Sequence, residues 1–443
     1  MQVLKFGGTS VGSIENMMAV RHIIDTPQPK VVVLSAMSGT TNTLTQIAAC
    51  ARYKREEEYN VLYNKLEAFY NEVVEELFTD KKLKATAIGY VNTLFTDIDR
   101  FANETVFTQF EEDAILAQGE LLSSFIFCHF LKQEGLNAVL LPALDFMRID
   151  NNQEPDNYYI RENVNRFITH GNDNVIYITQ GFICRDFEGR VSNLQRGGSD
   201  YTATILGAAI GASEVQIWTD IDGFHNNDPR FVEETTALPV LSYDEAAELA
   251  YFGAKILHPQ TVQPLREQKI PLRLKNTMHP NALGTLVTHH PEGKGVKAIA
   301  AKDGITAIKI KSGRMLQSHG FLSKVFDIFA RYETAIDMIT TSEIAISLTI
   351  DDESHLDAIL KELAVFSQVS TDMKQSIICL VGDAVNRDMQ TPQLFQVLRD
   401  VHVRMISYGG SDHNISLVVA TDDKQRALQL LQQYMFQELK AVV

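Results

Sequence analysis

Cysteine is scarce in this chain, with 4 among 443 residues, and the cysteines lie far apart. Cys50, Cys128, Cys184 and Cys379 form no CxxC pair and lack the ligand spacing of a zinc site. A disulfide framework and a structural zinc centre are therefore both disfavoured. We expect reduced thiols, as is usual in cytoplasmic proteins.

Positive charge is in deficit, because 40 Lys and Arg residues oppose 56 Asp and Glu residues and leave a formal net charge of −16. Nucleic acids and anionic membranes are polyanions, so this balance disfavours both as partners. Long apolar runs are also missing, since no uninterrupted stretch of about 18 apolar residues occurs. Strand-like residues begin at Val3, so the pattern of a cleavable leader, a charged segment followed by an apolar one, is not seen before them. The sequence predicts a cytoplasmic protein that binds neither nucleic acid nor membrane.

The motifs of P-loop enzymes and protein kinases are absent as well. No GxxxxGK[ST] occurs, since Gly293 and Lys294 are followed by Gly295, and no GxGxxG lies between a strand and a helix. The HRD and DFG triplets of protein kinases are missing. His289 and His290 have no convergent third ligand nearby, so no metal site is predicted. Any phosphate chemistry must use other residues.

Strands and helices alternate over roughly the first 290 residues. The apolar strands VLKF, VVVLS, VIYITQGFI and VQIWTD each precede a turn and a helix or loop. Short apolar strands followed by helices indicate an open, mostly parallel sheet flanked by helices. Glu120 lies amid apolar residues of a helix predicted over 111–133. The segment 276–297, rich in Pro and Gly, is predicted to be a linker.

The pattern changes after this segment and then repeats. Strand, helix, strand, strand and helix follow one another twice, with an offset of about 70 residues. This order predicts two ferredoxin-like βαββαβ units. We therefore expect a domain at 1–295 and smaller domains at 296–373 and 374–443. The strand predicted at 296–301 belongs either to the first small domain or to the second.

Charged residues beside glycine pairs mark the ends of several predicted strands. Glycine exposes backbone N–H groups, and these together with a helix N-terminus stabilise bound anions. In an open parallel sheet such strand ends converge on one crevice, so separate loops would place positive charges around one ligand. The candidate residues for this ligand site are Lys5 before Gly7 and Gly8, Arg196 before Gly197 and Gly198, Asp200, Thr219, Asp220, and Lys255 after Gly253.

Five motifs carry a family resemblance. They are KFGGTSVG at 5–12, LSAMSGTTN at 34–42, QRGGSDYTA at 195–203, WTDIDG followed by DPR within 218–230, and FGAKILHP at 252–259. Together they resemble the motifs of aspartate kinases, which belong to the amino-acid kinase family. The likeness extends over nearly the whole chain and includes two C-terminal ACT domains. The stretch from RMLQSHGFL to IDMITTSEIAISLTID is most similar to the lysine-sensitive monofunctional class.

The resemblance implies transfer of the γ-phosphoryl group of ATP to the side-chain carboxylate of L-aspartate. The product would be 4-phospho-L-aspartate, in the first step of lysine, threonine and methionine biosynthesis. A carboxylate with a reference pKa of about 3.9 is already ionised at neutral pH, so no general base is required. The barrier is the approach of two anions, which positive charge and positioning lower.

The resemblance also implies roles for individual residues. Lys5 would stabilise the transferring phosphoryl group, Lys255 would hold the ATP phosphates, and Asp200 would orient the lysine charge. Mg²⁺ would arrive on the phosphates and need no protein cage. The residues implied to bind the nucleotide are Lys5, Gly7, Gly8, Thr9, Ser10, Thr219, Asp220, His225, Asp228, Arg230 and Lys255.

For the amino acid, Arg196 would grip the α-carboxylate and Glu120 would pair with the α-ammonium group. The remaining substrate positions implied by the family are Ser35, Thr41, Phe182 and Ser199. An acetylated amine carries no charge for Glu120, which counts against acetylglutamate kinase. At His225 this chain departs from the family, which usually has Tyr beside the nucleotide, so stacking on the base would change character.

The ACT domains imply an end-product effector and pairing with other copies. Feedback inhibition by lysine in a homodimer or tetramer is the expectation. The residues matching lysine-binding positions are Met315, Ser318, Ile336, Asp337, Ser342 and Glu343.

Other interpretations remain open at this point. Another carboxylate kinase of the same fold, such as a glutamate kinase, would share much of the pattern. A non-catalytic amino-acid sensor would use the ACT domains alone, although Lys5, Asp200 and Lys255 are all present. A fusion to homoserine dehydrogenase is not expected, because the chain ends after the second repeat and has no dinucleotide-binding GxGxxG.

Overall fold

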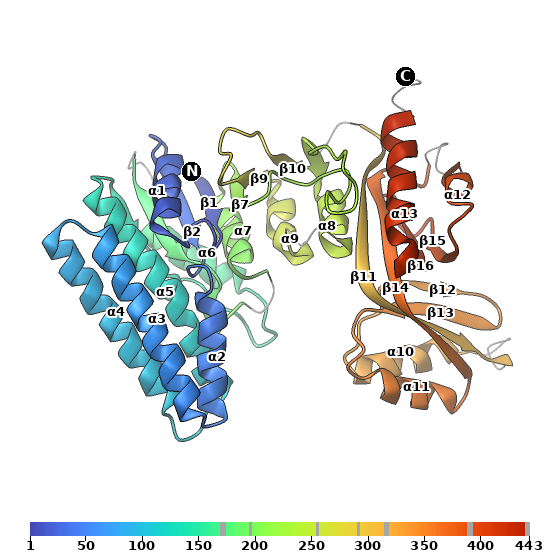
Figure 1. Ribbon diagram of the computed structural model, residues 1–443, viewed down its shortest axis with the longest axis horizontal. Helices are drawn as coiled ribbons and strands as arrows, with labels where there is room; N and C mark the ends of the chain where they lie inside the picture. The colour runs from blue at the N-terminus through green and yellow to red at the C-terminus, as the bar shows by residue number, and fades with distance from the viewer. Residues whose placement is uncertain are drawn as a thin grey trace. The chain divides into compact units, whose positions relative to one another are not determined.

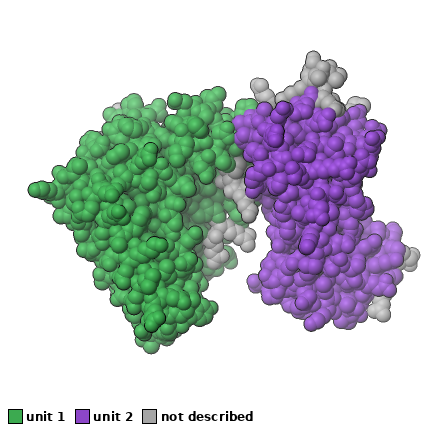
Figure 2. Space-filling model, viewed as in Figure 1, with its two compact units in different colours: residues 1–224, 239–243, 257–291 green, residues 225–238, 244–256, 292–443 purple. Residues whose placement is uncertain are grey.

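The computed structural model describes residues 1–168, 174–194, 197–253, 257–289, 293–313, 319–387 and 393–438. The chain forms two compact units, which Figure 2 distinguishes by colour. Unit 1 contains residues 1–224, 239–243 and 257–291, and unit 2 contains residues 225–238, 244–256 and 292–443. Each unit is described by itself.

Unit 1 is built on an eight-stranded sheet in the order β3-β4-β2-β1-β7-β9-β10-β8. Every neighbouring pair is parallel except β9 and β10. β2 is KVVVL with all five residues buried, as expected of a central strand covered on both faces. The predicted mostly parallel sheet is confirmed. Its strands are β1 (Gln2–Phe6), β2 (Lys30–Leu34), β3 (Ala138–Leu140), β4 (Ile176–Gln180), β7 (Val215–Thr219), β8 (Val240–Ser242), β9 (Leu272–Asn276) and β10 (Thr285–Thr288).

One sequence expectation fails in this sheet, because the segment predicted as a linker contains β10. β10 pairs with β8 on one side and with β9 on the other. Gly284, just before it, has a φ of +68°, and a Cβ there would lie 1.8 Å from the carbonyl oxygen of Leu274. A four-residue strand enclosed by Pro and Gly has too short a periodic pattern to be recognised from sequence.

Helices α2, α3, α4 and α5 lie side by side in unit 1 (Figure 1). α5 is long and apolar enough to cross a membrane by length and composition alone, but 78% of its most apolar stretch is buried inside unit 1, as in the core helix of a soluble protein. The helices of this unit are α1 (Ile14–Ile24), α2 (Thr40–Arg52), α3 (Glu56–Leu77), α4 (Lys81–Ala102), α5 (Gln109–Gln133), η1 (Ala143–Asp145), α6 (Asn157–Phe167), α7 (Gly198–Ile210) and α9 (Pro259–Gln268). A separate hairpin joins β5 (Ile183–Arg185) to β6 (Val191–Asn193).

Unit 2 contains one six-stranded antiparallel sheet in the order β12-β13-β11-β14-β16-β15. Its strands are β11 (Gly295–Lys311), β12 (Ile339–Thr341), β13 (Ala345–Ile350), β14 (Gln368–Asp383), β15 (Val403–Ser407) and β16 (Asn414–Ala420). Its helices are α10 (Phe321–Arg331), α11 (Leu356–Ala364), α12 (Leu394–Val397), α13 (Thr421–Gln432) and the π-helix η4 (Gln433–Glu438). Two apolar cores lie along the sheet, one with α10 and α11 and the other with α12 and α13.

The two predicted ferredoxin-like units share their longest strands. The first part of β11, from Gly295 to Lys302, pairs with 377–383 of β14, whereas Ile305 to Lys311 pairs with 368–375. Ile299 lies in the core that contains α13, and Ile308 lies in the core that contains α10. β14 likewise runs through residue 373, where the sequence analysis divides the two domains. The boundaries at 295 and 373 stay predictions.

Unit 2 also includes residues 225–238 and 244–256, and the latter segment holds most of α8 (Tyr243–Phe252). Asn227 donates to the side-chain oxygen of Gln432 on α13 over 3.1 Å, and Gln432 donates to the carbonyl of Glu234 over 2.7 Å. Both Asn227 and Gln432 are buried. The loop 225–238 is therefore anchored on the last helices of the chain.

Candidate functional site

The sheet of unit 1 brings several sequence-distant loops to one edge. β4, β2, β1, β7 and β9 are neighbours and run parallel, so the loops after them start at the same edge. Such an edge is where open α/β sheets bind ligands. Ser35 follows β2, Gly7 follows β1 and Asp220 follows β7.

Lys5 and Asp200 form an ion pair at this edge. The Lys5 Nζ lies 2.7 Å from Asp200 Oδ1, and the two side chains are only 12% and 17% exposed. Asp200 stands in the first turn of α7, where the helix dipole favours negative charge. Gly197 before this helix has a φ of +73°, and a Cβ there would lie 2.6 Å from Thr261 Cγ2. The glycine pair therefore permits the turn that aims Asp200 at Lys5.

The Gly-rich turn after β1 packs closely on neighbouring backbone. A Cβ on Gly8 would lie 2.7 Å from the carbonyl oxygen of Ala36, which only glycine tolerates. The Ser10 hydroxyl is buried and bonds to the Thr277 hydroxyl over 2.8 Å. A Cβ added to Gly7 would lie 3.6 Å from Lys5 Nζ. Thr9, in the same turn, is exposed. The lysine amine and the turn thus lie against each other.

Glu120 is a buried carboxyl without a charged partner among the described residues. It is 3% exposed, and its Oε1 accepts from the backbone N–H of Ala36 over 3.2 Å. No described residue donates a hydrogen bond to Oε2. Burial raises the pKa of Glu120 to about 8. Gly119 permits this placement, because a Cβ there would lie 2.9 Å from the Cβ of Ala36. A small cation would satisfy the free oxygen.

Hydroxyl groups and an aromatic ring lie close to the same loops. Ser35 donates to Ser199 over 3.0 Å, and Ser123 donates to the Ser35 carbonyl over 2.8 Å. Phe182 has a φ of +67°, a conformation that is rare for an aromatic residue, and its N–H donates to Thr202 Oγ1 over 2.9 Å. The structure brings Ser35 and Ser199 together, and Phe182 lies next to α7 through Thr202. Thr41, in the first turn of α2, is exposed.

The residues expected to line the nucleotide fall in both units. In unit 1, Thr219 donates to Asp220 over 3.0 Å. In unit 2, the Nδ1 of His225 lies 3.0 Å from Thr235 Oγ1, and Arg230 donates to both carboxylate oxygens of Asp228, the closer at 2.6 Å. Burial alone would raise the pKa of Asp228, but the hydrogen bonds from Arg230 hold it below its usual value.

Among the residues expected to bind an effector, Asp337 has the most unusual surroundings. Its side chain is 0% exposed, and Oδ1 accepts from Lys302 over 2.9 Å and from the hydroxyl of Tyr251 over 2.7 Å. Its Oδ2 is buried with no hydrogen-bond partner among the described residues. Lys302 also pairs with Asp351 over 2.8 Å. Burial alone would lower the pKa of Lys302, but its bonds to these two carboxylates raise it.

The other effector candidates that the structure describes are more open. Ile336 packs at the edge of the core that contains α10, whereas Ser342 and Glu343 are exposed beside the turn between β12 and β13. Four expected site residues lie outside the described residues, so the structure is silent on them. They are Arg196, Lys255, Met315 and Ser318.

Sequence reasoning missed several residues that support these side chains. Ser123 had a usable signal, because it stands three positions after Glu120 on the same helix face. Thr202 lies within the motif QRGGSDYTA but was not singled out. Thr277, Tyr251 and Lys302 had no signal, since each meets its partner through packing of distant segments. Among the described residues, no group of three or more His, Cys, Asp or Glu side chains could hold a metal ion.

Comparison with known proteins gives a consistent family assignment. Residues 1–276 match the amino acid kinase family, and residues 308–361 and 378–435 match the ACT domain. The chloroplastic aspartokinase 1 of Arabidopsis thaliana is 34% identical, over 98% of this chain and 80% of that protein. The lysine-sensitive aspartokinase 3 of Escherichia coli is 32% identical, over 98% of this chain and 99% of that protein.

Solved structures agree. Aspartokinase III of E. coli in complex with aspartate and ADP, in its R state, has a TM-score of 0.83 at 31% identity. The same protein in complex with lysine and aspartate, in its T state, has a TM-score of 0.81 at 31% identity. Each comparison covers 99% of this chain and 100% of the other.

Proposed function

Because this chain belongs to the aspartokinase family, within the amino acid kinase family, we propose that it phosphorylates L-aspartate through the Lys5 and Asp200 pair. The reaction transfers the γ-phosphoryl group of ATP to the side-chain carboxylate and yields 4-phospho-L-aspartate and ADP. The observation that carries the residue assignment is the short, largely buried Lys5–Asp200 contact at the ligand-binding edge of the sheet.

The reaction needs positive charge rather than a base. The nucleophile is a carboxylate that is already ionised at neutral pH, so Asp200 has no proton to remove. Lys5 instead offsets the charge that builds up as two anionic groups approach, and Asp200 holds the amine in place. A fixed charge in a largely buried position requires little reorganisation during the reaction.

Recognition of the amino acid rests on Glu120. An α-ammonium group would supply the partner that Oε2 lacks among the described residues, and Ser35 and Ser199 would lie beside the substrate. Arg196 would bind the α-carboxylate. This pairing favours a free amino acid over an acylated one, because an amide carries no positive charge.

The nucleotide would lie along the turn after β1 that Gly7, Gly8, Thr9 and Ser10 form. The exposed Thr9 would offer its hydroxyl, whereas the buried hydroxyl of Ser10 is bonded to Thr277 and would support the turn. Thr219, Asp220, His225, Asp228, Arg230 and Lys255 complete the proposed nucleotide set. Mg²⁺ would be bound through the ATP phosphates, in keeping with its preference for phosphate and water oxygens.

Regulation by lysine is the proposed task of unit 2. The E. coli relative is lysine-sensitive by name, and its T-state complex contains lysine. In this chain the buried Oδ2 of Asp337, which has no hydrogen-bond partner in the described part of the structure, suits an incoming ammonium group. The other proposed effector residues are Met315, Ser318, Ile336, Ser342 and Glu343. We further propose a homodimer or tetramer formed through the ACT domains, in the cytoplasm.

Hydroxylamine trapping tests the proposal directly. Purified protein with Mg-ATP, L-aspartate and hydroxylamine should form aspartyl hydroxamate, and millimolar lysine should suppress it. L-Glutamate and N-acetyl-L-glutamate in place of aspartate should give no hydroxamate. Hydroxamate that lysine leaves unchanged would retain the kinase and contradict the effector. No hydroxamate at all would contradict the kinase and favour a non-catalytic sensor.

A further inference from the structure

The hairpin of β5 and β6 begins directly after Phe182 and is fastened on two sides. On the β5 side, the N–H of Arg185 donates to the carbonyl of Met147 over 2.9 Å. On the β6 side, the N–H of Leu194 donates to the Phe182 carbonyl over 2.7 Å, which closes the base of the hairpin. Phe182 is therefore held through its own backbone by the end of β6.

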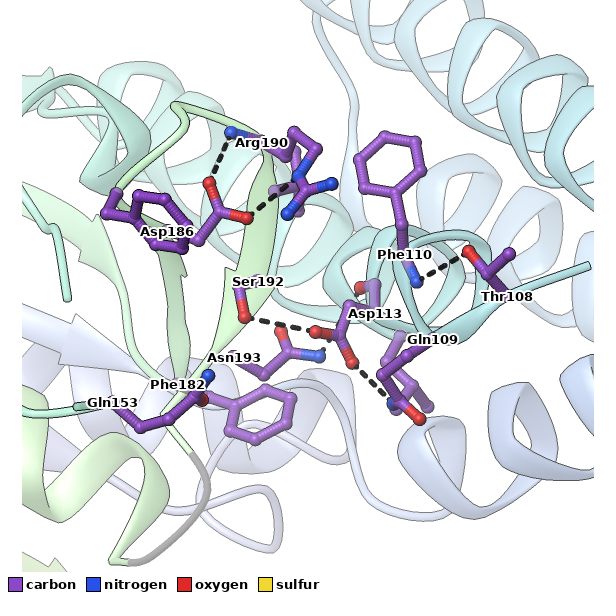
Figure 3. A pocket seen from close by; sticks show the side chains of 13 residues that line it. Thr108, Gln109, Phe110, Asp113, Gln153, Phe182, Asp186, Arg190, Ser192 and Asn193 are labelled. Carbon is purple, nitrogen blue, oxygen red and sulfur yellow. Dashed lines mark hydrogen bonds and ion pairs between the residues drawn. The ribbon is translucent and has the colours of Figure 1, made fainter. Parts of the chain in front are cut away.

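The β6 side is joined to α5 through Asp113, as Figure 3 shows. Ser192 Oγ donates to Asp113 Oδ2 over 3.0 Å, and Asn193 Nδ2 donates to the Asp113 carbonyl over 3.4 Å. On the helix side, Gln109 Nε2 donates to Asp113 Oδ1 over 2.9 Å. One carboxylate oxygen of Asp113 thus accepts a hydrogen bond from the helix, and the other accepts one from the hairpin.

A cavity of about 600 Å³ lies beside this bridge, between the hairpin and the first turns of α5. Phe110, Leu116, Phe182, Phe187 and Val191 supply its apolar lining. The cavity opens beside this contact, while α5 still packs against β6, where Asn193 is buried. The hydrogen bonds of Asp113 supply polar links across the contact.

Asp113 and Glu120 stand on one face of α5, since they are seven residues apart, which is about two helical turns or roughly 10 Å. Asp113 is half-buried, and burial raises its pKa, although the bonds from Gln109 and Ser192 oppose this shift. The carboxyl therefore occupies a costly position. Its fixed links connect the helix that carries Glu120 to the hairpin that holds Phe182.

We propose that Asp113 is a positioning residue for the amino-acid site, because it fixes the hairpin that holds Phe182 to the helix that carries Glu120. This inference rests on the proposed function, since Glu120 and Phe182 are taken there as substrate contacts. Phe182 has a left-handed backbone conformation that surrounding structure must maintain. Releasing β6 from α5 lets Phe182 relax and weakens aspartate binding. Lys5 and Asp200 are held by β1 and α7 and keep their pairing.

The test compares Asp113→Ala, Asp113→Asn and Arg190→Gln with the wild type. Arg190 is the matched control, because it lines the same cavity but forms its ion pairs within the hairpin, with Asp186 over 2.9 Å and Glu188 over 2.7 Å. KM for aspartate, KM for ATP and kcat are measured by ADP release. Aspartate affinity is measured in parallel by titration calorimetry, which does not depend on turnover.

Asp113→Ala should raise KM and Kd for aspartate about tenfold or more, while KM for ATP stays within about twofold. Asp113→Asn should restore wild-type values, because its amide can donate to Ser192 and accept from Gln109. Arg190→Gln should leave both KM values unchanged. Thermal unfolding confirms that each variant is folded.

Several results would overturn the inference. They are an unchanged aspartate affinity in Asp113→Ala, equal rises in both KM values, and no rescue in Asp113→Asn. If the wild type binds aspartate and Asp113→Ala weakens this binding as predicted, but the wild type forms no hydroxamate, the proposed function alone is refuted. A wild type that binds no aspartate at all would refute both.

Discussion

The proposed contact between Glu120 and the α-ammonium group of aspartate predicts that aspartate binding depends on pH, because Glu120 is buried. Its pKa is raised to about 8, so near neutral pH the empty site holds a protonated, uncharged carboxyl. An ammonium group binds the ionised form, which means that binding releases a proton. The apparent dissociation constant is then the intrinsic one multiplied by 1 + 10^(pKa − pH). Between about pH 6.5 and about pH 8.5 this factor falls from roughly 33 to roughly 1.3, so aspartate binding should tighten roughly 25-fold.

The assay is kcat/KM for aspartate by ADP release, measured across this range at saturating Mg-ATP and constant ionic strength. Glu120→Gln is the matched control, because it keeps the shape and cannot titrate. The pH profile of Glu120→Gln should lack the rise in kcat/KM. At about pH 8.5 its KM for aspartate should exceed that of the wild type by roughly tenfold to a hundredfold, which corresponds to the free energy of one hydrogen bond to a charged group. Identical pH profiles for the two proteins would refute the reasoning.

Stability should show the opposite trend. The native state keeps the Glu120 proton to about pH 8, whereas the unfolded chain releases it near the ordinary glutamate pKa of 4.5. The stabilisation from the protonated form is present below that ordinary pKa and is lost as pH rises toward the native one. The wild type without ligand should therefore lose Tm relative to Glu120→Gln as pH is raised to about 8, and aspartate should restore it. Parallel Tm curves would contradict the burial argument.

Three further predictions concern other parts of the chain. Lys5→Ala should lower kcat by at least about 10²-fold while calorimetric binding of lysine is retained, and appreciable residual turnover would contradict its role. Tyr251→Phe removes one donor from Asp337, so the lysine concentration for half inhibition should fall about fivefold, whereas a rise would exclude competition for that carboxylate. Gly181→Ala would place a Cβ 2.3 Å from a side chain of α7, so it should lower the free energy of unfolding measured in urea by about 1–3 kcal/mol. Gly89 lies in a helix, and a Cβ there would have nothing within 4 Å, so Gly89→Ala should raise the free energy of unfolding by about 0.5–1 kcal/mol. Equal effects of the two glycine changes would show that the close approach at Gly181 is unimportant.

Local pattern sufficed for much of this protein. Short apolar strands before Gly-rich turns predicted the mostly parallel sheet, and a repeated order of strands and helices predicted two ferredoxin-like units, whose strands form one antiparallel sheet in the structure. The family resemblance implied that Asp200 orients the charge of Lys5, and the two side chains lie 2.7 Å apart, whereas their roles stay predictions. The sheet predictions succeeded because side-chain periodicity and turn chemistry depend on residues that are near one another in sequence.

Other features were decided only when distant segments packed together. The raised pKa of Glu120 comes from removal of water by the surrounding helices and loops, which no local pattern encodes. The joining of the two repeats through β11 and β14 depends on strand register across a gap of about 70 residues. The attachment of the β5–β6 hairpin to Asp113 likewise unites residues 79 positions apart. The sequence predicted which residues carry the chemistry. The tertiary structure decided their charge state and spacing, because desolvation and register arise only between surfaces that folding brings into contact.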